Sequence, residues 1–457
     1  MLGQPAPVDV GQIEHVEVRY ALVDVLVLDA RDRTVPGLAA RDFELYVDGE
    51  PVAVVSVDES CAEGQVDDPR GGEGPVGAAL RAGGPPARFV HVFDYPHLEH
   101  PTEALTRARE ALERRGRELD EHVVAVFNPG LRIESAPARG TADALRALVR
   151  MESDRTLYDG AYARLTERGF FRSLEMLLDV LEVWPGAKVV LLYSGPFLAD
   201  GFDHDVAHRE VAARAARARV ALYTIDAAGM RTPKGFRYGD LGGSRMLARL
   251  AIETGGRSTR NTNDLGLGYA RAQRDLACRY TLGFYERSAS PDQPQRLTIR
   301  TLRAGARVVH PAAYAPQSPA KRHESRLAGA LAAPELFPRG GLAVEVESVE
   351  SDAVPAVRLR LRLAPSWPVR DPAGWTLVGR ITRRTGVVVH ELEAPLAGGA
   401  GDTVELGEVR DLSPRPYRLT IVAAHPEVET PFAVSMDFEV PESPRGRDPQ
   451  RPVSDSP

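Results

Sequence analysis

This 457-residue chain contains four nearly continuous apolar runs of strand length, with helical patterns between them. Of all features of the sequence, these runs limit the possible folds most. They are Phe89–Phe93, Val123–Phe127, Lys188–Tyr193 and Ala221–Asp226. A strand that is apolar on both faces has to be covered on both faces, which is typical of parallel sheets flanked by helices. We therefore predict an α/β module with a doubly wound, mostly parallel sheet over residues 87–290, ending in a strand at Tyr280–Tyr285.

Period-two alternation predicts β-structure on both sides of this module. Residues 12–60 and 295–315 together form a predicted β-rich module, and residues 341–441 form a predicted β-sandwich of immunoglobulin or fibronectin type. Three segments remain: a Gly/Pro-rich linker at 61–86, a Pro/Ala-rich linker with one short helix at 316–340, and a disordered tail at 442–457.

Charge and cysteine content exclude several classes of function. Lys and Arg number 57 and Asp and Glu number 64, so a net charge of −7 provides no global basic field for nucleic acid. No stretch approaches the roughly 18 consecutive apolar residues of a membrane span, so none is predicted. Cys61 and Cys278 are too few for a zinc ribbon or an iron–sulfur site, and the sequence leaves open whether they pair.

The amino terminus has no basic segment followed by an apolar core, so no secretion signal is visible. Either the protein is cytoplasmic, or it is an exported protein whose signal has been trimmed.

Polar residues at the ends of the predicted parallel strands are the candidate site. Ligands of open α/β sheets gather outside the carboxyl ends of the strands, where this sequence has Asp94, Asn128, Ser194 and Asp226. A carboxylate there can hold a hard cation, accept backbone N–H groups or cap the next helix. These alternatives remain open for Asp94 and Asp226.

Known catalytic motifs are absent from the sequence. Ser194 has no Gly-x-Ser-x-Gly context, and there is no phosphate-binding Gly-x-x-x-x-Gly-Lys. His97 and His100 follow Asp94 closely and could add imidazole ligands, which favour Zn²⁺ over Mg²⁺. This leaves an alternative hypothesis, a metal-dependent hydrolase or enzyme component using Asp94 with His97 or His100.

Six short segments occur in an order that is similar to one known family. They are Gly37–Gly49, Thr156–Gly160, Tyr223–Gly229, Glu253–Arg257, Asn261–Leu265 and Tyr280–Tyr285. Through them the chain resembles bacterial proteins related to the von Willebrand factor type A domain, over residues 16 to about 314. The resemblance implies a Rossmann-like sheet and leans toward an exported protein, periplasmic or extracellular.

The same resemblance implies a metal-ion-dependent adhesion site, which this sequence matches only in part. Asp94 fits the first aspartate and Thr156 fits the threonine, whereas Pro96 and Leu98 replace two serines and Ser194 replaces the second aspartate. Mg²⁺ requires an octahedron of oxygens, so we expect a degenerate site that binds Mg²⁺ or another divalent cation weakly or not at all, and no other cofactor.

The sequence therefore predicts a non-enzymatic, adhesion-type interaction protein that binds another protein of unknown identity. Its expected binding rim consists of Asp94, Asn128, Thr156, Ser194 and Asp226. In a further alternative, the α/β module is only a spacer between β-modules.

Overall fold

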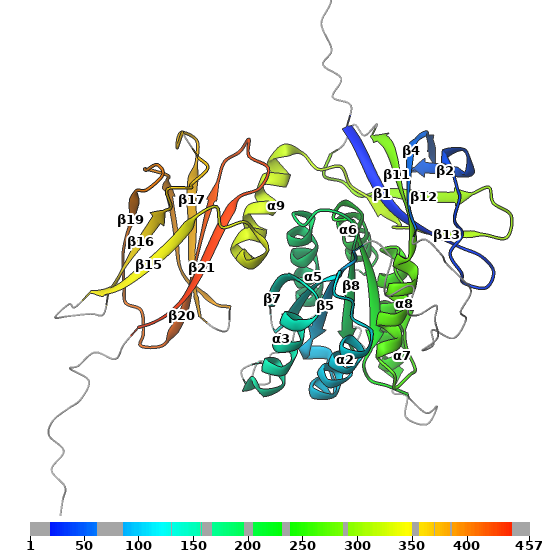
Figure 1. Cartoon of the computed structure of the whole chain (residues 1–457), viewed down its shortest axis with the longest axis horizontal. Helices are drawn as coiled ribbons and strands as arrows, with labels where there is room; N and C mark the ends of the chain where they lie inside the picture. Colours follow the sequence, from blue (N-terminus) through cyan, green and yellow to red (C-terminus); the bar gives the residue numbers. More distant parts are fainter. Residues whose placement is uncertain are drawn as a thin grey trace, which may run out of the picture.

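The structure, a computed structural model, describes most of the 457 residues (Figure 1). The described residues are 19–61, 86–128, 130–155, 157, 167–195, 204–230, 238–286, 291–349, 356–369, 371–383 and 386–440. The tail expected at 442–457 and most of the linker expected at 61–86 lie outside them, as does Thr156. Among the described residues, no helix is both long and apolar enough to cross a membrane.

A six-stranded sheet forms the centre of the α/β module, in the order β10-β9-β8-β5-β6-β7. Neighbouring strands are parallel except β6 and β7, which are antiparallel. The strands are β5 (Arg88–Asp94), β6 (Glu121–Phe127), β7 (Leu131–Arg139), β8 (Lys188–Ser194), β9 (Val220–Asp226) and β10 (Ser258–Thr259). The expected mixed α/β architecture with a largely parallel sheet is therefore present.

Helices cover both faces of this sheet (Figure 1). They are α2 (Pro101–Arg115), α3 (Ala142–Ser153), α5 (Glu167–Glu182), α6 (His204–Arg217), α7 (Tyr238–Glu253) and α8 (Gly266–Leu276). Alternate side chains of one strand enter different cores: Val90 and Val92 pack with α5, α6 and α7, and Phe89 and Phe93 pack with α2, α3 and α8. This two-sided burial explains why the strands are apolar at nearly every position.

The β-rich module consists of two four-stranded sheets that share a core. One sheet has the order β13-β1-β11-β4 and the other β14-β12-β2-β3. Their strands are β1 (Arg19–Leu28), β2 (Phe43–Val47), β3 (Glu50–Val52), β4 (Val54–Cys61), β11 (Cys278–Glu286), β12 (Gln295–Thr301), β13 (Arg307–Val309) and β14 (Ala313–Tyr314). The α/β segment is thus inserted between β4 and β11.

Strand β11 corrects the expected end of the α/β module at residue 290. It pairs with β1 and β4 and does not join the parallel sheet. Tyr280, Leu282 and Phe284 point into the core of the β-rich module, while the intervening residues Thr281 and Gly283 do not contribute to that core. This alternation is that of an antiparallel strand with one buried face, so the apolar content of β11 does not reflect burial on both faces.

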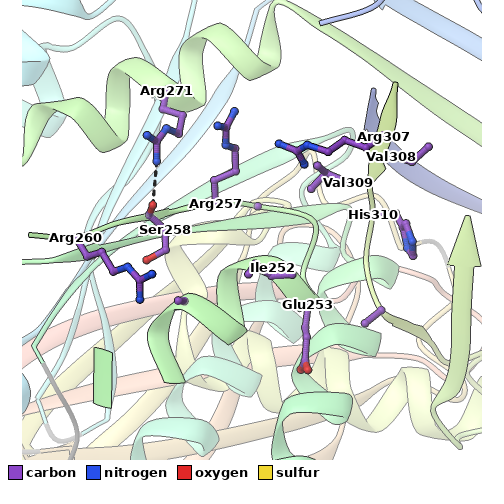
Figure 2. A pocket seen from close by; sticks show the side chains of 13 residues that line it. Ile252, Glu253, Arg257, Ser258, Arg260, Arg271, Arg307, Val308, Val309 and His310 are labelled. Atoms are coloured by element: carbon purple, nitrogen blue, oxygen red, sulfur yellow. Dashed lines mark hydrogen bonds between the residues drawn. The ribbon is translucent and has the colours of Figure 1, made fainter. Parts of the chain in front are cut away.

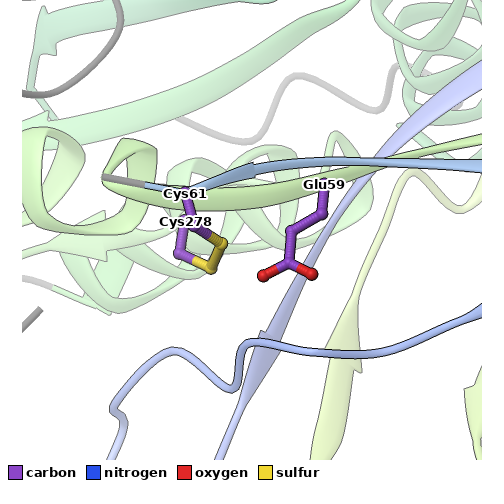
Figure 3. Close-up of side chains that lie close together, drawn as sticks. All are labelled: Glu59, Cys61 and Cys278. Carbon is purple, nitrogen blue, oxygen red and sulfur yellow. A yellow bond between two sulfur atoms is a disulfide. The ribbon is translucent and has the colours of Figure 1, made fainter. Parts of the chain in front are cut away.

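Cys61 and Cys278 form a disulfide between β4 and β11 (Figure 3). The two residues lie directly opposite each other in the antiparallel register, although 217 positions separate them in the sequence. The bridge therefore joins the two points at which the chain leaves and rejoins the β-rich module.

The segment expected as a linker at 316–340 contains α9 (Pro319–Ala332) and the short 3-10 helix η4 (Pro334–Leu336). The Ser318 side chain accepts a hydrogen bond from the backbone N–H of Lys321 at 3.2 Å, which caps the helix. Ala330 and Phe337 pack in the same core as α5 and the C-terminal strands. The segment is consequently part of a folded core.

The C-terminal region folds into two antiparallel sheets around one core. Their orders are β15-β16-β19 and β18-β17-β20-β21. The strands are β15 (Leu342–Val349), β16 (Ala356–Leu363), β17 (Thr376–Arg383), β18 (Val388–Pro395), β19 (Thr403–Arg410), β20 (Pro416–Ala424) and β21 (Phe432–Glu439). Alternating burial along β16, with Leu359 and Leu361 inside and Arg360 outside, is what packing of two sheets requires.

Candidate functional site

The candidate site lies at the carboxyl ends of the central strands. The register aligns Phe93 of β5 with Tyr193 of β8, and Ser194 of β8 with Asp226 of β9. Asp94, Ser194 and Asp226 therefore end three adjacent strands at one level of the sheet. The strand order reverses between β5 and β8, and such a switch point is where open α/β sheets bind ligands.

Asp94 is hydrogen-bonded within its own chain. Its Oδ2 accepts a hydrogen bond from Ser194 Oγ at 2.7 Å and another from His97 Nδ1 at 2.8 Å. Asp94 is fully buried, and its Oδ1 has no hydrogen-bond partner within the described residues. Ser194 and His97 thus both bind the same carboxylate oxygen of Asp94.

Gly195 allows the short 3-10 helix η2 (Tyr95–His97) to lie against the end of β8. A Cβ added at Gly195 would lie 2.0 Å from the backbone oxygen of His97. Since backbone cannot give way as a flexible side chain does, any side chain at position 195 would push η2 away and lengthen the His97–Asp94 hydrogen bond.

We predict that Gly195→Ala lowers the free energy of unfolding by about 1–3 kcal/mol, the usual range for overpacking. Urea unfolding followed by circular dichroism would measure it. Gly130→Ala is the matched control at the same edge of the sheet, because a Cβ there meets no atom within 4 Å. Equal stability of the two variants would contradict the close approach.

Asn128 and Asp226 make no hydrogen bond to Asp94 within the described part of the chain. Asn128 donates from Nδ2 to the backbone oxygen of Leu157. Asp226 Oδ1 accepts a hydrogen bond from the backbone N–H of Ala228 at 3.1 Å, which stabilises the turn after β9. Thr156, the second expected metal ligand, lies outside the described residues. Asp94 and Ser194 are therefore the pair that the structure brings into direct contact.

The described part of the rim, which does not include Thr156, offers few oxygen ligands for a divalent cation, and among them Asp94 Oδ1 is buried and has no hydrogen-bond partner there. Mg²⁺ needs about six oxygens in a strict octahedron, and Ser194 Oγ and Asp94 Oδ2 already bind each other. Within the described residues, one group of three potential ligand residues has its ligand atoms within 4.8 Å of one another, and it consists of Glu59, Cys61 and Cys278 (Figure 3). Its two sulfurs form the disulfide, so they are not thiolate ligands.

The geometry also differs from that of a hydrolytic triad. In such triads the imidazole lies between the hydroxyl and the carboxylate, so that it can take the proton of the nucleophile. Here the carboxylate of Asp94 lies between Ser194 and His97. His100 is exposed before the first turn of α2, and no hydrogen bond joins it to Asp94 in the described part of the chain.

Sequence reasoning missed a buried histidine pair in the central sheet. His91 Nε2 of β5 lies 3.2 Å from His122 Nδ1 of β6, and Phe89 stacks on the His122 ring. Burial lowers the pKa of His91 well below its usual value, and lowers the pKa of His122 to about 4. The only sequence signal was a histidine inside an apolar strand, which by itself does not reveal a partner.

No family model matches this chain, and no curated protein sequence matches it. Several solved structures are similar in part.

An aerotolerance-related membrane protein from Bacteroides fragilis is 12% identical, with a TM-score of 0.29 over 41% of this chain and 98% of that one. Proximal thread matrix protein 1 from the mussel byssus, in a form with a zinc-occupied MIDAS motif, is 14% identical, with a TM-score of 0.28 over 45% of this chain and 48% of that one. The ArnB paralog VWA2 from Sulfolobus acidocaldarius is 8% identical, with a TM-score of 0.24 over 94% of this chain and 77% of that one. At these identities and with TM-scores below 0.5, the likenesses carry no argument about the family, the site or the function.

Proposed function

We propose that this protein is a non-enzymatic interaction protein of adhesion type, and that the rim around Asp94 and Ser194 binds another protein without a resident metal. One observation carries the proposal: at the switch point of the sheet, the Asp94 carboxylate is held by Ser194 and His97 of its own chain. Asp94 and Ser194 are both buried, so the pair supports the rim from beneath, and the exposed residues around it would contact the partner.

A hollow beside the rim extends this proposed surface. It is lined by the residues that precede and begin α2, among them Glu99, His100 and Glu103. Arg107 is paired with Glu110 at 3.2 Å and lies 3.9 Å from Glu103. Carboxylates outnumber the arginine here, so the proposed partner presents basic side chains to this end of the rim.

The Cys61–Cys278 disulfide supports export, because disulfides persist in oxidising compartments and are rare in the cytosol. We propose a periplasmic or extracellular location, where adhesion to another protein would take place.

Charge reversal at the hollow tests the proposed partner surface. We expect Glu99→Lys to weaken capture of the natural partner from the native host by tenfold or more, since like charges across an interface repel. Glu427→Lys makes the same charge change at an exposed position before β21 and serves as the control. Unchanged capture by Glu99→Lys would instead favour an α/β module that is only a spacer.

Titration calorimetry with Mg²⁺, Mn²⁺, Ca²⁺ and Zn²⁺ separates this proposal from the enzyme alternative. If the proposal is right, Asp94→Asn binds each cation as the wild type does, or neither protein binds it. Submicromolar Zn²⁺ binding that is lost in Asp94→Asn would overturn it and favour a hydrolase using His97 or His100.

A further inference from the structure

A second cavity lies between the α/β module and the β-rich module, away from the rim. It has a volume of about 560 Å³ and is formed by the end of α7, by β10, by α8 and by β13. Four arginines line it, and we call it the arginine cavity: Arg257, Arg260, Arg271 and Arg307. In Figure 2, Arg257, Arg260 and Arg271 lie on one side and Arg307 reaches in from the other.

Two of the four arginines are neutralised by carboxylates of the chain. Arg257 binds Asp32 at 2.7 Å and Asp275 at 3.3 Å, and Arg307 binds Asp32 at 2.6 Å. These contacts hold the guanidinium groups of both residues in place and connect the α/β module with the β-rich module.

The positive charges of the other two arginines are not paired with a carboxylate within the described residues. Arg271 Nη1 donates to the backbone oxygen of Ser258 at 2.9 Å, which is a neutral acceptor (Figure 2). Arg260 is exposed and has no carboxylate partner within the described residues. The one acidic residue in the lining, Glu253, accepts a hydrogen bond from Arg249 Nε at 2.7 Å. The cavity therefore has a surplus of positive charge.

The electrostatics of Arg271 agree with this surplus. Burial, Arg257 and Arg274 lower the pKa of Arg271, and Asp275 and Asp32 oppose them only in part, so that its pKa lies below its usual value. An anion held between these guanidinium groups would offset their mutual repulsion, and a guanidinium fork matches the two oxygens of a carboxylate or phosphate.

Part of the lining is apolar. Val308 and Val309 of β13 lie on one side, and Ile252, whose side chain is 64% exposed at the end of α7, lies on another. An inorganic ion would leave this surface in contact with water. A ligand with an apolar body would cover it and gain the hydrophobic contribution.

We propose that the arginine cavity binds a small organic anion, with its carboxylate or phosphate on Arg260 and Arg271 and its apolar body on Val308 and Val309. The volume lies within the range of about 300–1,000 Å³ that small-molecule sites occupy. This site shares no residue with the rim, so the proposal does not depend on the proposed adhesion function.

Titration calorimetry on the full chain with phenyl phosphate, phenylacetate and inorganic phosphate tests the proposal. We expect phenyl phosphate or phenylacetate to bind, and the tighter of the two identifies the preferred oxyanion. Inorganic phosphate is expected to bind more weakly than phenyl phosphate, because it lacks the apolar body.

Charge-removing variants then assign the binding to the cavity. Arg260→Gln and Arg271→Gln are each expected to weaken binding about tenfold, the usual loss for a charge-assisted hydrogen bond. Arg339→Gln removes an exposed arginine outside the lining and should leave the affinity unchanged. Arg260 makes no ion pair within the described residues, so its variant should keep the fold even if Arg271→Gln does not.

Three results would overturn the proposal. They are no binding of either aromatic probe at millimolar concentration, binding that neither arginine variant weakens, and inorganic phosphate binding as tightly as phenyl phosphate.

Discussion

Reducing the Cys61–Cys278 disulfide is expected to lower the free energy of unfolding by about 5 kcal/mol. The bridge closes a loop with a sequence separation of 217, and the entropy that it removes from the unfolded chain grows with loop length. Urea unfolding with and without a reductant, followed by circular dichroism, would measure the difference.

The double variant Cys61→Ser and Cys278→Ser is the control. It should show the reduced stability from the start and no response to reductant. If the wild type unfolds at the same urea concentration in both conditions, the bridge does not contribute the expected constraint on the unfolded chain.

Lowering the pH from 7 to 4 is expected to destabilise the protein through His91 and His122. Burial places the folded-state pKa of His122 at about 4, below its usual value of 6.5. Between these two values the unfolded state binds more protons than the folded state, so stability is fully present above about pH 6.5 and falls as the pH drops toward 4. For His122 alone the loss approaches about 3 kcal/mol.

The double variant His91→Asn and His122→Asn removes both titrating rings while keeping polar side chains at the two positions. Its unfolding free energy should change less between pH 7 and pH 4 than that of the wild type, measured by urea unfolding at each pH. Comparing the variant with the wild type separates the contribution of the histidines to the pH dependence from that of buried acids. One such acid is Asp179, whose pKa is raised by burial. Parallel pH profiles would show that the pair is not the source of the acid sensitivity.

The central sheet could be predicted because the feature that its strands require, an apolar run of strand length, is visible in the local sequence. Each buried parallel strand has to be apolar on both faces, and all seven residues of β8 are buried as that requirement implies. The same logic predicted that polar residues ending these strands would meet at one edge, and Asp94 does contact Ser194.

The errors arose where long-range pairing decides the structure. Strand β11 looks like its apolar neighbours along the chain, but its partner β1 lies more than 250 residues earlier. The composition of residues 316–340 suggested a linker, whereas α9 packs on α5 and β20 and thereby completes a core. The residues within either segment do not indicate which distant strands or helices it packs against.

The candidate site was partly predictable for the same reason. The strand pattern identified Asp94, and the resemblance to the von Willebrand factor type A domain implied the loss of two serines. Neither could show that His97 would turn its Nδ1 toward the Asp94 carboxylate. The arginine cavity was not foreseen, because it joins Arg271 of α8 with Arg307 of β13 across two modules.

The position of the disulfide has a mechanical consequence. The α/β module begins after Cys61 and ends before Cys278, and these two residues face each other across β4 and β11. Tension applied to the two ends of the chain would pass from β4 to β11 through the covalent sulfur bridge, bypassing everything between them. The α/β module, which carries the rim, would thus not be unfolded by tension that passes through the bridge.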